Sequence, residues 1–442
     1  MKKIFRCFGV IVGLFLCSSV ALAQGGEAAT LDSGNTAWIM AATMLVMLMT
    51  IPGLAFFYGG MVRRKNVLSV MMQCIVLTAV ITIEWIVYGY SAVFGTGFAD
   101  SGIVGEFIGG FDKIFLHGIS KDTLTSGNIP EVLFALFQCK FAVITPALIV
   151  GAFAERIKFS GFLLFSILWT ILVYNPMAHW VWGGGWMMRM GALDFAGGTV
   201  VHITAGTSAL ILAIMLGKRK GYGTNMMIPH NIPHVVLGTA LLWLGWFGFN
   251  AGSGLAADGL AANAFLVTHL ATSVAAVTWM TMEWLLHKKP TVIGICTGAV
   301  AGLVAITPAA GSVDALGALF IGLISAIICF TSVAYLKPKF GYDDSLDAFG
   351  VHGVGGFVGA ILTGVFATQV ITDGAQGALY GDWHQLGVQA VVNLAAIVFA
   401  AAMTFILFKF VDKTVGLRAD EKSEAIGLDI SQHGEIAYSE EE

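Results

Sequence analysis

Two histidines occupy matching positions in two apolar segments of the chain. His202 lies in VHITAGTSALIL (201–212) and His352 in VHGVGGFVGAIL (351–362), in register and 150 residues apart. Ionisable side chains inside such segments are costly in a membrane, so they indicate function or internal pairing. Facing imidazole rings can share a hydrogen bond and can relay a proton. The alternatives are two packing histidines and a chance match between short motifs.

A metal or haem site at these histidines would need further ligands. The sequence contains neither HExxH nor CxxCH. Its six cysteines have no CxxC spacing; two lie near the N-terminus and four lie singly in apolar segments: Cys7, Cys17, Cys74, Cys139, Cys296 and Cys329. We interpret the last four as packing residues and expect no metal and no cofactor.

Two aspartates precede the histidine motifs. Asp194 lies three residues before the predicted span that carries His202. An aspartate there typically caps a helix by accepting backbone N–H groups, a role that is compatible with function. Asp347, five residues before His352, is predicted to do the same in the second motif.

Aromatic side chains gather near the predicted span ends. In WFGFNAGS (246–253) they adjoin Asn250 and Ser253, and ring faces with a hydroxyl acceptor suit a cation vestibule. An interfacial aromatic belt is the alternative for the whole set: Trp180, Trp182, Trp186, Trp243, Trp246, Phe247 and Phe249.

The composition indicates that membrane helices position these residues. The 442 residues are 57% hydrophobic and 11% charged, with a mean hydropathy of +0.83. A net charge of −4 without a basic block argues against nucleic-acid binding. No set of nucleophile, base and orienting residue is visible, so an enzyme is the least favoured class.

Eleven apolar stretches have about the length that spans a bilayer: 37–60, 67–96, 131–153, 160–179, 197–217, 233–253, 263–286, 291–307, 314–336, 350–369 and 386–410. We predict an all-α polytopic membrane protein with eleven transmembrane helices. The two histidine motifs lie in the fifth and the tenth of these stretches, five spans apart, which predicts an inverted five-plus-five helix repeat with its site at the repeat interface.

The predicted domains are a signal peptide (1–23), a membrane domain (24–410) and a C-terminal tail (411–442). The first segment has Lys2, Lys3 and Arg6, a short apolar run and an Ala-Leu-Ala ending, as in a cleaved signal; a twelfth spanning helix is the alternative. The acidic tail is either a disordered solvated end or, given its pattern, an ordered one.

Lysines and arginines are distributed unevenly between the two predicted sides. Sixteen of the 23 fall in the tail and in connections on one side, and only Lys113, Lys121 and Arg189 fall in the opposite loops. The positive-inside rule then places the mature N-terminus outside and the C-terminus inside. With an exported N-terminus, we expect a multi-pass protein of the bacterial cytoplasmic (inner) membrane.

The sequence resembles the Amt/Mep/Rh ammonium transporter family, and its bacterial Amt members most of all. The resemblance covers nearly the whole mature chain, with several long motifs in order: IPGLAFFYGGMVRRKNVLS (51–69), ITPALIVGAFAERIKF (144–159), VWGGG (181–185), DFAGGTVVHITAG (194–206), GWFGFNAGS (245–253), DAFGVHGVGG (347–356), and GLR, GLD and HGEIAY in the tail. It implies transport of ammonium or ammonia by a homotrimer with one pore per subunit. It also implies a tail that receives a PII-type signal protein at the cytoplasmic face.

The resemblance further implies roles for nine residues. An external ammonium vestibule would comprise Trp182, Phe141 and Ser253, with Phe137 above or beside it. Phe141 and Phe249 would be the paired rings that close the pore, and Trp246, His202 and His352 would line it. Asp194 matches an aspartate near the vestibule that is structural and helpful to the cation.

Lys140 departs from the family pattern, in which a neutral residue usually precedes the pore phenylalanine. Its amine has three interpretations: it extends outward or pairs harmlessly, it faces the vestibule and repels the substrate, or burial alters its ionisation.

The function of the protein also has alternatives, since an ammonium sensor that signals through a PII partner would share the fold. A redox or haem protein is not favoured, because the sequence lacks the further residues that would ligate a haem or a metal.

Overall fold

The computed structural model describes residues 30–125, 127–372 and 374–438, and all regular secondary structure in this part is helical. From Leu31 onward the chain forms one unit. The all-α prediction is therefore confirmed for the described residues. The predicted signal peptide, residues 1–23, lies outside them.

Among the described residues, ten helical segments are long and apolar enough to cross a membrane, and several consist of α-helices joined by π-helical turns. They are Ser33–Met61 (α1 Ser33–Leu48, η1 Met49–Leu54, α2 Ala55–Met61); Arg64–Phe94 (η2 Arg64–Asn66, α3 Val67–Glu84, η3 Trp85–Gly89, α4 Tyr90–Phe94); Glu131–Phe153 (α5); Phe159–Arg189 (α6 Phe159–Trp169, η6 Thr170–Tyr174, α7 Asn175–Trp182, α8 Trp186–Arg189); Gly198–Leu216 (η7 Gly198–Ile203, α9 Thr204–Leu216); Ile232–Gly252 (α10); Gly259–His287 (α11); Ala315–Phe340 (α13 Ala315–Thr331, η8 Ser332–Leu336, α14 Lys337–Phe340); Phe349–Phe366 (η9 Phe349–Gly353, α15 Val354–Phe366); and Trp383–Thr414 (α16).

The remaining predicted span, 291–307, coincides with the shorter helix α12, Val292–Ile306. Its 15 residues extend about 22 Å at 1.5 Å per residue, less than a hydrocarbon core of about 30 Å. The structure thus supports about ten membrane-spanning helices, and the count of eleven stays a prediction. Other short elements are η4 Gly102–Glu106, η5 Ile114–Leu116, η10 Ala378–Tyr380, α17 Glu421–Ile426 and η11 Asp429–His433.

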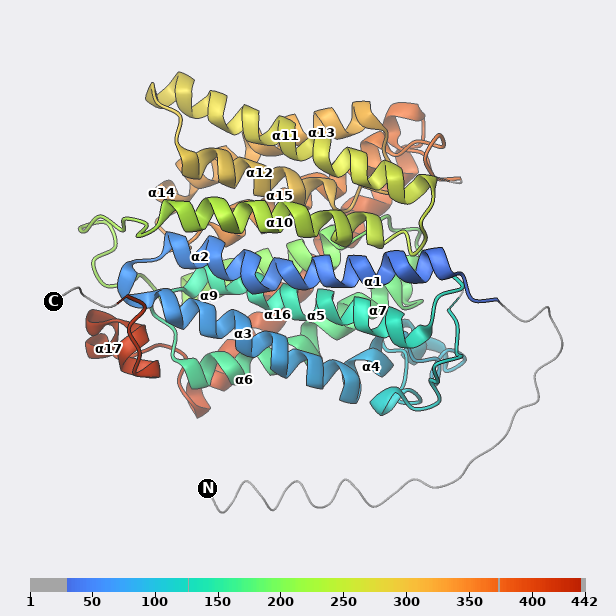
Figure 1. The fold of residues 1–442 in the computed structure, drawn as a ribbon, viewed down its shortest axis with the longest axis horizontal. Coiled ribbons are helices and arrows are strands. Elements are labelled where there is room, and N and C mark those ends of the chain that lie inside the picture. The colour runs from blue at the N-terminus through green and yellow to red at the C-terminus, as the bar shows by residue number, and fades with distance from the viewer. Residues whose placement is uncertain (1–29, 126, 373, 439–442) are drawn as a thin grey trace, which may run out of the picture. The chain divides into compact units, whose positions relative to one another are not determined.

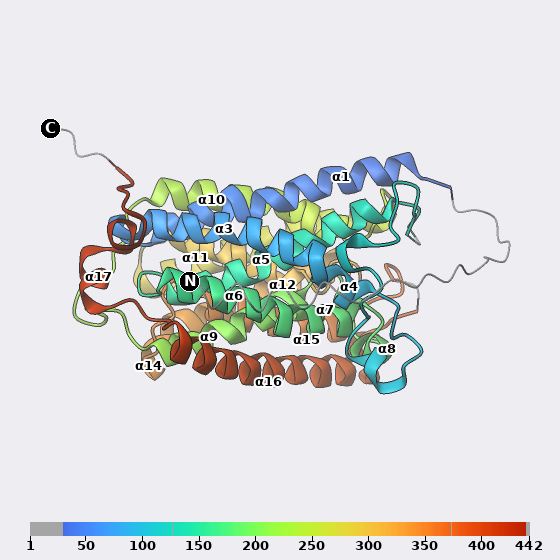
Figure 2. The ribbon, with the colours of Figure 1, turned by 90° about the horizontal axis from the view of Figure 1, so that it is seen from below.

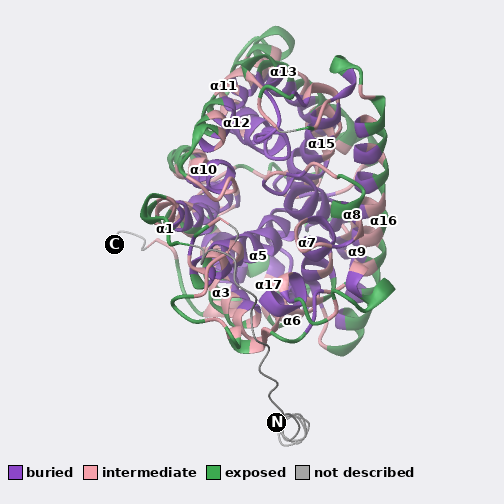
Figure 3. Ribbon diagram, turned by 90° about the vertical axis from the view of Figure 1, so that its right-hand side faces the viewer, coloured by how far each residue is buried: buried purple, intermediate pink, exposed green. Residues whose placement is uncertain are grey.

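The long helices lie side by side with similar directions (Figures 1 and 2). Seen end-on, α5, α7, α9, α12 and α15 are mostly buried, whereas α11, α13 and α16 expose their outer faces (Figure 3). Those outer faces carry large apolar side chains, including Leu285 (69% exposed) and Val398 (68% exposed). An apolar exterior on helices of this length is what lipid requires. The chain is therefore a multi-pass membrane protein.

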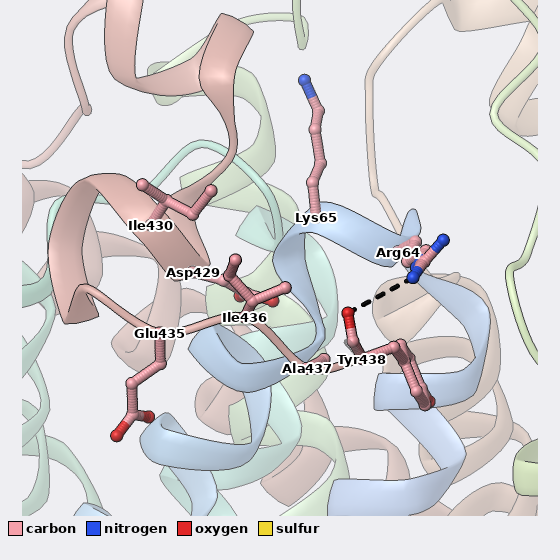
Figure 4. A pocket seen from close by; sticks show the side chains of 8 residues that line it. All are labelled: Arg64, Lys65, Asp429, Ile430, Glu435, Ile436, Ala437 and Tyr438. Carbon is pink, nitrogen blue, oxygen red and sulfur yellow. Dashed lines mark hydrogen bonds between the residues drawn. The ribbon is translucent and has the colours of Figure 1, made fainter. Parts of the chain in front are cut away.

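The C-terminal tail up to residue 438 is ordered and lies against the ends of the membrane helices. Asp429 accepts a hydrogen bond from the Ser69 backbone N–H (2.8 Å), and the Lys158 N–H donates to the Leu417 carbonyl (2.8 Å). Tyr438 bonds both His230 and Arg64, on the rim of a cavity of about 420 Å³ between the tail and the 64–65 connection (Figure 4). The ordered alternative for the tail is therefore confirmed for the residues up to 438.

A buried charge cluster joins the connections beneath the tail. Arg219 donates to both carboxylate oxygens of Asp343 (Nη2–Oδ1 2.8 Å, Nε–Oδ2 3.0 Å) and approaches Glu155, which also pairs with Arg63. Burial by itself would raise the pKa of Asp343, but the hydrogen bonds and charge of Arg219, with the charge of Arg156, outweigh it and lower that pKa. Asp343 is therefore ionised and stabilising at neutral pH.

We expect Asp343→Asn to lower the free energy of unfolding at pH 7 by about 1.5–3 kcal/mol, the usual contribution of a hydrogen bond to a charged group. A lowered pKa means that this stabilisation is present above the ordinary aspartate value of about 3.9 and is lost as the pH falls through the folded value. SDS titration from mixed micelles should therefore show parent and variant converging below about pH 4. Parallel pH profiles would contradict this, and Asp122→Asn, at an exposed aspartate, is the control.

Candidate functional site

His202 and His352 meet at the contact between two helical segments. Their Nδ1 atoms are 3.3 Å apart, and their rings lie 5.3 Å apart between centroids with 16° between planes. Each histidine lies in a π-helical turn, η7 or η9, that leads into a 13-residue helix, α9 or α15. Both side chains are buried. The structure thus brings together the two motifs that the sequence pairs.

Glycines permit this contact. A Cβ on Gly206 would lie 2.0 Å from the backbone nitrogen of Gly353, and one on Gly356 would lie 2.9 Å from the Cβ of His202. Any larger residue would separate the two segments. Gly206 and Gly356 each follow their histidine by four residues, so the same position performs this packing role in both motifs.

The histidine contact defines how the rings can hydrogen bond. Two nitrogens 3.3 Å apart can share only one proton, so one Nδ1 donates and the other accepts. The Nε2 atom of His202 is buried and has no hydrogen-bond partner in the described part of the chain. Buried nitrogen atoms are normally paired. This atom is therefore available to a small polar species that passes the ring.

Aromatic rings continue from the histidines in one direction. Trp246 stacks on His202 with centroids 5.4 Å apart, and its indole N–H donates to the Thr307 hydroxyl (2.8 Å). Phe249 lies 6.1 Å from His202 and 4.3 Å from Phe141. Thr307 thus orients the tryptophan, a role that no motif in the sequence signalled.

Beyond Phe141 the rings border a cavity of about 210 Å³, which we call the outer cavity. Its lining residues are mostly apolar: Phe94, Phe134, Gln138, Phe141, Val181, Trp182, Met188, Phe195, Ser253 and Leu255. The Ser253 hydroxyl donates to the Phe249 carbonyl (2.8 Å), which leaves its oxygen lone pairs for a donor in the cavity. Gln138 is a second polar lining residue, which the sequence analysis missed.

Of the five residues predicted at or near the vestibule, three line this cavity. Trp182, Phe141 and Ser253 line it, whereas Phe137 packs behind Phe141 with centroids 5.0 Å apart and is fully buried. Asp194 is also absent from the lining, and its carbonyl oxygen accepts the Trp182 indole N–H (2.9 Å). Asp194 therefore acts on the cavity by holding the tryptophan.

The Asp194 carboxylate caps the turn that carries His202, as the sequence predicts. It accepts the backbone N–H groups of four consecutive residues, Gly197 to Val200. Burial raises the pKa of Asp194, and these four amides act in the opposite direction. All hydrogen bonds that this carboxylate accepts come from backbone N–H groups.

The predicted cap of the second motif is wrong. Asp347 instead pairs with Lys337, and Asp344 accepts the N–H groups of Ala348 (3.1 Å) and Phe349 (2.8 Å). Asp344 precedes His352 by eight residues, the distance that separates Asp194 from His202. This shared spacing was the available signal. Equal spacing lets each carboxylate reach the first amides of its π-helical turn.

On the other side of the histidines lies a smaller cavity of about 40 Å³, lined in part by His352, Tyr58 and Asp347. The paired rings and histidines therefore lie between two cavities. Lys140 lines neither, and it follows the exposed residues Val132 and Leu136 at intervals of four on α5. Lys140 is nevertheless buried, with 8% of the residue exposed, so the outward extension of its amine stays a prediction.

Comparison with known proteins shows which family the chain belongs to. Fold and site together define a multi-pass membrane protein with paired aromatic rings and histidines between two cavities. Residues 37–438 match the family model described as Ammonium Transporter Family. The chain belongs to that family. Among the described residues, no group of three or more His, Cys, Asp or Glu side chains is arranged to hold a metal ion.

Similar proteins include an ammonium transporter of Bacillus subtilis, 50% identical over 93% of this chain and 100% of that protein. The crystal structure of Saccharomyces cerevisiae Mep2 superposes with a TM-score of 0.85, at 35% identity over 93% and 92% of the two chains. A structure described as a sensor Amt protein has a TM-score of 0.82, at 29% identity over 90% and 98%.

Proposed function

We propose that this protein transports ammonium or ammonia across the bacterial cytoplasmic membrane. Ammonium is recruited at the outer cavity by Trp182, Phe141 and Ser253 and loses a proton at the Phe141–Phe249 rings. The proton passes to the His202–His352 pair, and the nitrogen crosses the histidines as ammonia. Phe137, Trp246 and Asp194 hold these groups in place. Membership of the ammonium transporter family supports the substrate, and the unpartnered Nε2 of His202 behind the closed rings is the observation that carries the route.

The free-energy costs of the two routes favour deprotonation of ammonium over passage of the intact ion. Moving a bare ion of this size into a dry interior costs of order 20 kcal/mol in the idealised limit and several kcal/mol after relaxation. A cation–aromatic contact returns only about 0.5–2 kcal/mol. Removing a proton from an amine of pKa about 10.4, with lysine as the stand-in, costs roughly 4.6 kcal/mol at pH 7. The rings can thus concentrate ammonium, and ammonia crosses at lower cost.

We further propose the finer architecture that the sequence predicts: eleven helices after a cleaved signal peptide, an inverted five-plus-five repeat, the C-terminus inside and a homotrimer in membrane lipid. The common placement of Asp194 and Asp344, each eight residues before its histidine, supports the repeat. An apolar groove of about 520 Å³ beside Trp38, Phe265 and Leu266 supports a contact with a neighbouring subunit. The ordered tail offers a surface for a PII-type signal protein.

The alternative is an ammonium sensor that signals through a PII partner. The likeness to a structure described as a sensor Amt protein favours it. Charge movement on a solid-supported membrane, together with uptake into liposomes followed by an internal pH dye, separates the two functions. A saturable response in either supports transport, and silence in both favours sensing or a pore closed by its tail.

We expect Trp182→Leu to raise the half-saturating ammonium concentration in these assays by about 5–30-fold, because a cation–aromatic contact contributes about 1–2 kcal/mol when desolvated. Trp180→Leu is the matched control: Trp180 packs on Phe399, its N–H donates to the Phe107 carbonyl, and it does not line the cavity. An equal effect of both substitutions would contradict a vestibule at Trp182.

A further inference from the structure

A second polar site lies apart from the histidine pair, at two π-helical turns. Glu84 ends α3 directly before η3, and Asn175 begins α7 directly after η6. The Asn175 side-chain N–H donates to Glu84 Oε1 (2.8 Å). Such turns inside helices occur frequently at functional sites. Intramembrane carboxylates are themselves rare and usually functional.

Three buried polar atoms of Glu84, Asn175 and the adjacent residue Tyr174 have no hydrogen-bond partner in the described residues. They are Glu84 Oε2, Asn175 Oδ1 and the Tyr174 hydroxyl. Tyr174 and Asn175 are 0% and 1% exposed. Since Oε1 bonds only a neutral amide and Oε2 bonds nothing, no basic side chain of the described chain neutralises Glu84. The site thus offers a carboxylate and two further oxygens without a counter-charge.

The site adjoins the outer cavity through one aromatic ring. Trp85 is fully buried, with its indole N–H donating to the Ala135 carbonyl (2.9 Å). Its ring lies 6.3 Å from Tyr174 and 6.3 Å from Phe94, a lining residue of the outer cavity. On the helix itself, a Cβ at Gly89 would lie 3.0 Å from Glu84 Oε2, so glycine leaves room for the carboxylate.

We propose that Glu84, Asn175 and Tyr174 bind one small cation with hydrogen-bond donors, of the ammonium class, in exchange for a proton on Glu84. An unpaired carboxylate in a low-dielectric interior is costly, so it carries either a proton or a cation. Ammonium supplies both the charge and N–H donors for three oxygens, whereas water lacks the charge and sodium lacks the donors. On binding, the Glu84 O–H bond breaks, its electron pair stays on the carboxylate, and the proton leaves to water. The site is separate from the proposed transport route.

Infrared difference spectroscopy of the purified full-length protein tests the exchange, with ammonium chloride compared against choline chloride at constant pH. We expect absorption of a buried protonated carboxyl group to fall, and that of a carboxylate to rise, saturably with ammonium. The difference should vanish in Glu84→Gln. It should persist in Glu131→Gln, a matched buried carboxylate that Tyr90 (2.7 Å) and Lys113 (2.6 Å) already satisfy.

Two graded variants test the ligand set. Asn175→Leu should raise the half-saturating ammonium concentration of the infrared signal at least tenfold, and Tyr174→Phe should raise it severalfold. Ammonium uptake by Glu84→Gln liposomes verifies folding and reports on the transport route separately. No ammonium-dependent carboxyl signal in the parent protein, or an equal signal with sodium chloride, would overturn the proposal.

Discussion

A His202→Leu/His352→Leu variant should lose ammonium-driven charge movement by at least about 10²-fold, the lower range for a positioned group that transfers a proton. The two Nδ1 atoms share a hydrogen bond, and His202 Nε2 has no partner in the described residues, so the pair offers a path for a proton between the cavities. Leucine retains comparable bulk but no nitrogen. Currents on a solid-supported membrane at several ammonium concentrations provide the measurement.

The control for this variant is His269→Leu, on α11, where the ring packs against Trp243 away from the pair. Its current should equal that of the parent. Unchanged current in the double variant, with monodisperse protein, would refute a proton relay. Uptake followed by an internal pH dye completes the test, because persistent uptake without current would mean that neutral ammonia still passes the leucines.

The largest loss of stability should follow Asp194→Ala. This substitution leaves four buried backbone N–H groups, Gly197 to Val200, without their acceptor. At the lower figure of about 1 kcal/mol for each unpaired buried donor, the free energy of unfolding falls by at least about 4 kcal/mol. The same turn carries His202, so residual folded protein should also lose transport. SDS titration from mixed micelles measures the loss.

Two further variants test whether the loss comes from the four-amide cap. Asp194→Asn keeps one acceptor oxygen and should cost less than alanine. Asp314 caps α13 by accepting a single backbone N–H group, that of Gly317 (2.9 Å). Asp314→Ala should therefore lower the free energy of unfolding by only about 1 kcal/mol. Equal losses at Asp194 and Asp314 would show that the four-amide arrangement contributes nothing beyond an ordinary cap.

The sequence misassigns residues whose roles depend on packing between helices, namely the second cap and the residues that line the outer cavity. Nearness to His352 favours Asp347 as the second cap, but the π-helical turn places Asp344 over the first amides. Phe137 and Phe141 lie four residues apart on α5, yet only Phe141 borders the outer cavity. Gln138 cannot be recognised from the sequence, because a half-buried glutamine in an apolar helix has no distinctive pattern.

By itself the sequence determined the helical class, the positions of the apolar spans, the family and the pairing of two histidine motifs. These follow from long apolar runs and from motifs read along the chain. Only the tertiary structure decided that the histidine nitrogens lie 3.3 Å apart, that Thr307 orients Trp246, and that Glu84 meets Asn175. The reason is physical: spacing along a helix specifies a face, but glycine contacts and π-helical turns determine which faces meet.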